Sequence, residues 1–240
     1  MSPTSRRVLL AGGYVLHQRP FRDSSLIIEI FTREHGRMSS FARAARGPRS
    51  RFHGLRPFQP LLLSWSGRGD APQLTGAEPD GASLVLPPAQ LLSAFYLNEL
   101  LIRLTTQHDP HPELFDLYAR TLQALNDATQ AETALRSFER QLLELLGFGL
   151  DLQHEAGGQP VQAHAHYHFR AGSGLQRADS VAGAFSGLML LQLAADEPLE
   201  DALLRQARAL MRAAIDHCLE GRELATRRVA RSIAQLERSA

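Results

Sequence analysis

The chain contains no lysine, so its 26 lysine or arginine positions are all arginine. This uniform choice indicates codon bias in a GC-rich genome, because it also holds where no function is expected. Arginine still offers a planar guanidinium that binds phosphate or carboxylate through two hydrogen bonds. Cysteine is nearly absent as well. The single residue, Cys218, excludes an internal disulfide and favours a reducing cytoplasmic location.

Long apolar runs and catalytic motifs are also missing. No apolar run approaches the roughly 20 residues that a membrane-spanning helix needs. The chain has no phosphate-binding loop, no GxGxxG, no nucleophile elbow, and neither HExxH nor CxxC. Its carboxylates are scattered over predicted helices, without the grouping of a metal-dependent nuclease. The sequence therefore predicts a protein that is not an enzyme and needs no cofactor.

The charge of the chain is distributed unevenly, although the formal net charge is only +1. Residues 1–60 hold eleven arginines and three acidic residues, whereas the remainder holds fifteen arginines and twenty-two acidic residues. A basic beginning followed by an acidic body indicates two units with different roles.

The basic charge is densest in residues 36–58, GRMSSFARAARGPRSRFHGLRPF, which hold six arginines and no acidic residue. Gly47, Pro48 and Gly54 prevent a helix there, and apolar alternating segments lie on both sides. A basic arm between two strands predicts binding to a nucleic-acid backbone. The residues predicted to contact DNA are Arg19, Arg22, Arg37, Arg43, Arg46, Arg49, Arg51 and Arg56.

Aromatic residues accompany this charge and allow two interpretations. Phe41, Phe52 and Trp65 are candidates for stacking on unpaired bases. A small barrel also needs large side chains inside, so core packing is the favoured role for each of them individually.

Residues 1–80 have the period-2 alternation of β-strands. SLIIEIFT places Leu26, Ile28 and Ile30 on one face, and the turn at Glu34–Gly36 predicts a hairpin with residues 36–41. Five short strands, with a long excursion between the third and the fourth, are typical of an OB-type barrel. The predicted strands are 8–17, 25–32, 36–41, 57–65 and 73–77.

Beyond the linker at 79–88 the apolar period changes to about 3.6, which indicates helices. The expected fold class is α+β and multi-domain: a five-stranded OB-type barrel in residues 1–80, then an all-α domain in residues 81–240. The latter has an irregular region at about 152–183 and a basic final helix within 222–238. The predicted helices are 89–107, 112–126, 132–146, 184–194, 198–219 and 223–236.

An ordered set of segments makes the chain resemble the RecO family of recombination mediators. The set includes GYVLHQRPFRDSSLIIEIFTREHGR and FARAARGPRSRFHGLRPFQPLLLSWSGRG in the barrel, then FYLNELLIRL, ALRSFERQLLELLGFGLDL, FSGLMLLQL and GRELATRR. The resemblance implies binding of single- and double-stranded DNA, strand annealing, and help in loading RecA onto DNA coated with SSB. It also implies RecR and the acidic SSB tail as partners. The expected location is the bacterial cytoplasm, in association with the nucleoid.

The family also bears on two sites in the helical domain. Many members carry a four-cysteine zinc site, but the equivalent stretch, Leu152–Tyr167, has no cysteine, so the chain resembles the subgroup without it. Arg136 and Arg140 lie beside apolar residues of a predicted helix and are candidates for binding the SSB tail. Ion pairing with Glu132 or Glu139 at helical spacing is the alternative for Arg136.

Two further clusters leave alternatives open. His164, His166 and His168 alternate and would accept a metal, but no paired ligand motif accompanies them, so no metal is predicted. The carboxy-terminal arginines either extend the DNA surface or are solvated charge at a helix end. They are Arg222, Arg227, Arg228, Arg231 and Arg238. The alternative overall function is an RNA- or ribosome-associated OB-fold protein.

Overall fold

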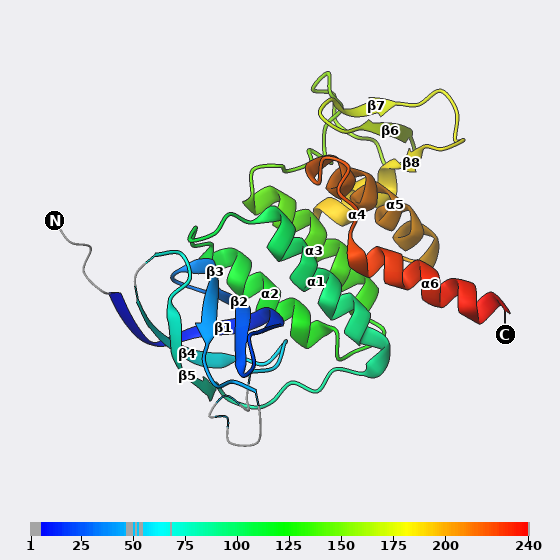
Figure 1. Cartoon of the computed structure of the whole chain (residues 1–240). Helices are drawn as coiled ribbons and strands as arrows, with labels where there is room; N and C mark the ends of the chain where they lie inside the picture. Colours follow the sequence, from blue (N-terminus) through cyan, green and yellow to red (C-terminus); the bar gives the residue numbers. More distant parts are fainter. Residues whose placement is uncertain (1–5, 47–49, 51, 53–54, 68, 240) are drawn as a thin grey trace. The chain divides into compact units, whose positions relative to one another are not determined.

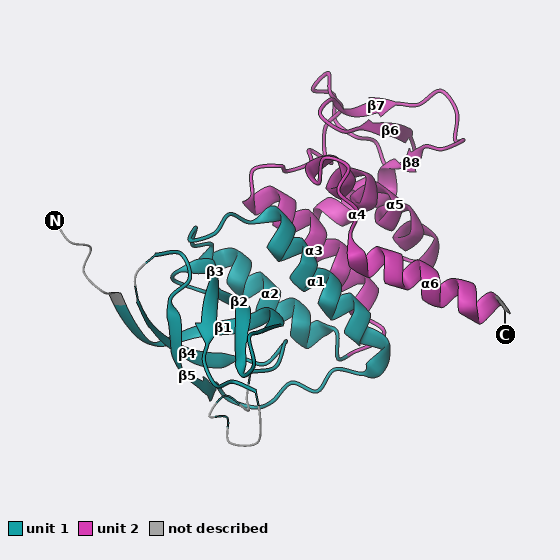
Figure 2. Ribbon diagram, viewed as in Figure 1, with its two compact units in different colours: residues 1–126 teal, residues 127–240 magenta. Residues whose placement is uncertain are grey.

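The computed structural model describes residues 6–46, 50, 52, 55–67 and 69–239. It divides into two compact units, residues 1–126 and residues 127–240 (Figure 2). The first unit begins with five strands, drawn from blue to cyan in Figure 1. They are β1 (Arg6–Phe21), β2 (Ser25–Thr32), β3 (Gly36–Ala42), β4 (Leu61–Gly67) and β5 (Gln73–Pro79).

The strands form a barrel in the order β1-β2-β3-β5-β4, with β1 also paired to β4. All neighbours are antiparallel except β3 and β5, which are joined by one parallel pair, Phe41 with Gln73. The Phe41 N–H also donates to the Pro72 carbonyl at 3.0 Å. The predicted OB-type fold is thus confirmed, and its ring closes through a single short contact, as expected of a partly open barrel.

The side chains that the two-residue hydrophobic period assigned to the inner face of the second strand do lie inside the barrel. Ile28 and Ile30 are fully buried, and Leu26 packs against the same core. Phe52 and Trp65 are 4% and 3% exposed, so both belong to the core, which was the favoured interpretation of these aromatics. The predicted hairpin is confirmed by the register, in which Thr32 faces Gly36 and Ile27 faces Phe41.

Two helices complete the first unit: α1 (Leu91–Leu104), after a short 3-10 turn at Pro88–Gln90, and α2 (Pro112–Ala124). A buried chain of hydrogen bonds ties them to β1. The Asn98 side-chain N–H donates to the Leu16 carbonyl at 2.8 Å, and the Tyr118 hydroxyl donates to Asn98 Oδ1 at 2.6 Å. Because burial disfavours the phenolate, it raises the pKa of Tyr118 well above its ordinary value, so the hydroxyl stays a donor.

Removing the Tyr118 hydroxyl is therefore expected to destabilise the first unit. Tyr118→Phe leaves the Asn98 carbonyl oxygen buried without its donor, which costs about 1–3 kcal/mol of unfolding free energy. Urea unfolding followed by the fluorescence of Trp65, the only tryptophan, measures this unit specifically. The double variant Asn98→Leu/Tyr118→Phe removes both polar groups and should cost less than the sum of the single changes. Strict additivity would mean that the two side chains are not coupled.

The second unit contains α3 (Ala131–Leu145), α4 (Gly187–Ala194), α5 (Asp201–Cys218) and α6 (Ala225–Ser239). It also holds a three-stranded sheet in the order β7-β6-β8, which the all-α expectation did not include (Figure 1). The strands are β6 (His166–Arg170), β7 (Gly174–Arg177) and β8 (Phe185–Ser186). Strands β6 and β7 lie inside the stretch 152–183, which was expected to be irregular. Strands this short have too few residues to show a two-residue hydrophobic period in the sequence.

The boundary between the two compact units does not lie at the linker 79–88, where the hydrophobic period changes. The first unit extends to residue 126 because α1 and α2 bond to the barrel. The division into folding domains at residue 80 stays a prediction. Within the described part of the chain, no helix is both long and apolar enough to cross a membrane.

Candidate nucleic-acid interface

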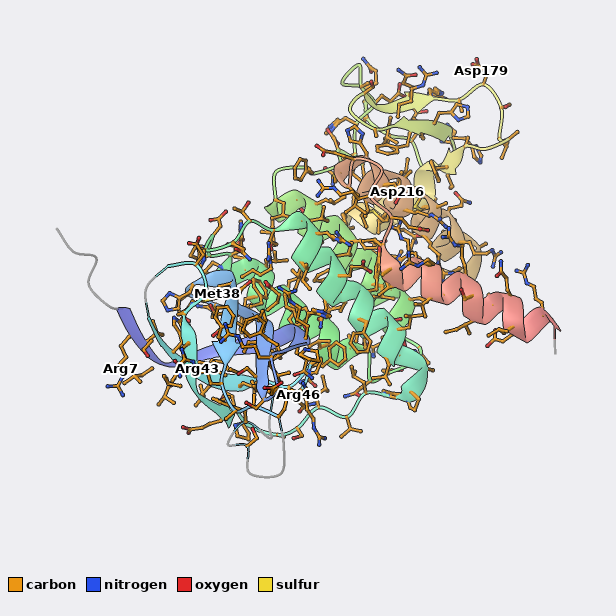
Figure 3. All side chains as sticks on the ribbon, viewed as in Figure 1. Arg7, Met38, Arg43, Arg46, Asp179 and Asp216 are labelled. Carbon is orange, nitrogen blue, oxygen red and sulfur yellow. The ribbon has the colours of Figure 1, made fainter. Side chains whose placement is uncertain are left out.

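The basic residues that the structure brings together lie on two neighbouring turns of the barrel. The first turn connects β1 to β2, and the second follows β3. The Arg46 N–H donates to the Ser24 carbonyl at 3.0 Å and so joins the two turns. Arg22 and Arg43 line the same hollow. We call Arg22, Arg43 and Arg46 the arginine cluster; Figure 3 labels the latter two on the barrel.

The arginine cluster is open to solvent. All three side chains are exposed, and none forms an ion pair with another described residue. The hollow beside it is lined by no carboxylate, although Asp23 and Asp70 are exposed on adjoining turns. Guanidinium groups that form no internal ion pair keep their N–H donors for an external anion, and a chain of phosphates is the ligand that several of them bind together.

Arg37, also predicted to contact DNA, lies apart from the arginine cluster. It is a half-buried residue of β3, and its Nη1 pairs with Glu29 Oε2 at 3.1 Å. Its Nε and Nη2 donate to the Thr105 hydroxyl at 3.1 Å and the Thr105 carbonyl at 2.8 Å, beyond the end of α1. With these nitrogens engaged, Arg37 joins the barrel to α1 and has little left to offer a phosphate.

The other predicted residues are dispersed. Arg19 is exposed on β1, two residues before the first turn. Arg56 is exposed but lines a separate groove formed with residues 57–61, 79, 81–86 and 91. Arg49 and Arg51 lie outside the described residues. Arg33 is neutralised by Asp116, and this hydrogen-bonded pair lowers the pKa of the Asp116 carboxyl.

Sequence reasoning missed Phe21. Its ring lies 5.5 Å from that of Phe41, centroid to centroid, and both side chains are half-buried at the hollow. The Arg22 guanidinium lies 5.2 Å from the centre of the Phe21 ring. A signal was present in the sequence, because Phe21 stands directly between Pro20 and Arg22 at a predicted turn.

The predicted tail-binding arginines of α3 are already engaged within the second unit. Arg136 is 5% exposed, and its Nη2 pairs with Glu139 Oε1 at 2.9 Å. Arg140 pairs with Glu144 at 2.8 Å and with Asp196 at 2.5 Å. Among the described residues the Nε atoms of both arginines are buried without a hydrogen-bond partner. Arg136 was predicted beside an apolar groove; in the structure it is buried and pairs with Glu139, three residues further along α3.

The histidine cluster and the carboxy-terminal arginines both lie in the second unit. His166 and His168 lie on β6, and no group of three His, Cys, Asp or Glu side chains in the described ranges could hold a metal ion. Of the carboxy-terminal arginines, Arg227 pairs with Asp216, Arg231 with Glu223 and Arg222 with Glu220. Three of the five are thus engaged by nearby carboxylates, which favours solvated helix charge over a DNA surface.

The family model described as "Recombination protein O N terminal" matches residues 8–81, and "Recombination protein O C terminal" matches residues 88–228. The DNA repair protein RecO of Alkalilimnicola ehrlichii is 48% identical over 98% of this chain and 95% of its own length. The chain belongs to the RecO family. The DNA repair protein RecO of Methylococcus capsulatus is 44% identical over 94% of each chain. That of Thiobacillus denitrificans is 42% identical over 96% of this chain and 94% of its own.

Membership of the RecO family assigns the chain a role in DNA repair and recombination. The two family matches meet between residues 81 and 88, where the apolar period also changes. The barrel and both of its turns lie inside the amino-terminal match, so the arginine cluster belongs to the part of the chain shared with RecO proteins.

Proposed function

We propose that the protein is a recombination mediator that binds DNA through the arginine cluster, without catalysing a covalent step. The observation that carries the proposal is the set of exposed, unpaired guanidinium groups at Arg22, Arg43 and Arg46 on a barrel of OB type. Such groups bind single and double strands alike through the phosphates. Arg19, Arg56 and the arm residues Arg49 and Arg51 would lengthen the contact.

Annealing of complementary strands would follow from the same surface. Neutralised phosphates repel each other less, and two strands held on one protein meet at a raised effective concentration. Help in loading RecA onto SSB-coated DNA, with RecR as a further partner, is the role that family membership supports.

We place binding of the SSB tail on α3. Arg140, whose side chain is 14% exposed, is the guanidinium that a tail carboxylate would reach first, in exchange for Glu144 or Asp196. Arg136 lies one turn before Arg140 and is paired with Glu139. It would support tail binding indirectly, by stabilising that turn of α3.

The test is a fluorescence-anisotropy titration of labelled single-stranded DNA, duplex DNA and RNA of one sequence across a salt series, alongside an annealing assay. We expect both DNA forms to bind with an affinity that falls steeply between about 50 and 200 mM salt, and annealing to accelerate at protein concentrations that saturate the strands. Clear preference for RNA would favour the RNA- or ribosome-associated alternative. Binding that is insensitive to salt would contradict a phosphate-directed interface.

A further inference from the structure

The hollow beside the arginine cluster has the composition of a nucleobase site. It measures about 710 Å³, within the range of small-molecule sites. Phe21 and Phe41 supply aromatic surface, and Arg22 and Arg43 supply positive charge. Ser24, Ser25 and Gln73 are its uncharged polar lining residues, and no acidic residue is among the described residues that line it.

The walls of the hollow are held in an unusual backbone conformation. Arg22 and Ala44 have φ angles of 53° and 51°, in the left-handed region that side chains other than glycine rarely adopt. Each such residue costs about 1–3 kcal/mol and persists only where its surroundings enforce it. The hydrogen bond from the Arg46 N–H to the Ser24 carbonyl and the pair Phe41–Gln73 tie down the chain near these two residues. Strain of this kind concentrates at binding sites.

The aromatic pair is shaped for stacking from outside. The ring centroids are 5.5 Å apart and the rings are inclined by 54°, which leaves no parallel slot for a base between them. Both side chains remain partly exposed, unlike Phe52 and Trp65, which the barrel buries completely. Every nucleobase has a π-face that stacks on such a ring, whereas phosphates gain nothing from it.

We propose that this hollow binds one unstacked nucleobase of a single strand, with Phe21 and Phe41 as the stacking surface. Arg22 and Arg43 hold the flanking phosphates. The assignment rests on the proposed DNA-binding function and adds to it a means of distinguishing single strands from duplexes. The bases of a duplex are already stacked and paired, so they cannot enter the hollow unless the duplex opens.

Oligonucleotides without bases test the proposal directly. The probes are a labelled oligothymidylate of about 12 nucleotides, the same strand with abasic sites at its central positions, and a duplex. We expect the wild type to bind the intact strand about tenfold more tightly than the abasic one, since one stacked base supplies an effect of this order. The variant Phe21→Leu/Phe41→Leu keeps the apolar filling and should lose this preference, with its salt slope and duplex binding unchanged.

The matched control is Phe148→Leu, because Phe148 is an aromatic residue that is 53% exposed in the second unit. It should leave the preference for the intact strand unchanged. Equal affinity of the wild type for intact and abasic strands would overturn the proposal, even if the double variant proved unstable. If the wild type bound none of the probes in a salt-dependent way, the DNA-binding function itself would fail, which is a different result.

Discussion

Changing Arg22, Arg43 and Arg46 together to alanine is expected to weaken binding of single-stranded DNA about a hundredfold at low salt. The three guanidinium groups are exposed and unpaired, so each would contribute about 1 kcal/mol through a solvent-accessible phosphate contact. Removing three contacts to a single strand should also reduce the slope of log affinity against log salt by about 2. Anisotropy titrations at several salt concentrations measure both quantities.

A control with the same change of net charge separates local contact from general attraction. Arg120, Arg170 and Arg205 are exposed and form no ion pair at hydrogen-bond distance in the described part of the chain. If binding depends on the arginine cluster, their triple alanine variant should change affinity by less than about threefold, because none of the three belongs to that cluster. Equal losses in the two triple variants would show that net charge, not the arginine cluster, determines binding.

The second large effect is expected from Arg136→Ala, on stability. Arg136 and Glu139 have side chains that are 6% and 2% exposed, so they form a buried ion pair on α3. Removing Arg136 takes this partner away from the buried Glu139 carboxylate, which is expected to cost up to about 3–5 kcal/mol in the unfolding free energy of the second unit. Hydrogen exchange of the α3 amides measures this unit without interference from the barrel.

The double variant Arg136→Met/Glu139→Leu separates a structural role from a binding role. Replacing both ions with apolar groups of similar size is expected to restore most of the stability. A labelled SSB tail peptide should then bind the double variant as it binds the wild type, and should bind Arg140→Ala more weakly. If the double variant were stable but did not bind the peptide, Arg136 would contact the tail directly.

The strands of the barrel could be predicted because one strand face is buried and the other is not. Ile28 and Ile30 flank the partly exposed Glu29 and are themselves buried, and the turn at residues 34–36 sets the hairpin register. Helix α2 begins at Pro112, where its fixed φ angle is already helical. These features depend on residues close together in the chain.

The site was harder to predict because charge in a sequence does not reveal its surroundings. Arg37 and Arg43 have the same side chain and lie on the same basic stretch. Arg37 nevertheless finds Thr105, 68 positions further along the chain, and becomes part of the interior framework. Arg136 similarly finds Glu139 inside the second unit, and Phe21 becomes significant only when folding brings it against Phe41.

The hydrogen-bonded chain from Leu16 through Asn98 to Tyr118 determines where this protein can be divided. A fragment ending at residue 81 would hold every strand of the barrel, yet it would present the Leu16 carbonyl and the rings of Tyr14 and Phe31 to water. The barrel that carries the arginine cluster is thus covered in part by helices that belong, by sequence, to the other family segment. A natural exchange of the carboxy-terminal segment would have to leave α1 and α2 attached to the barrel.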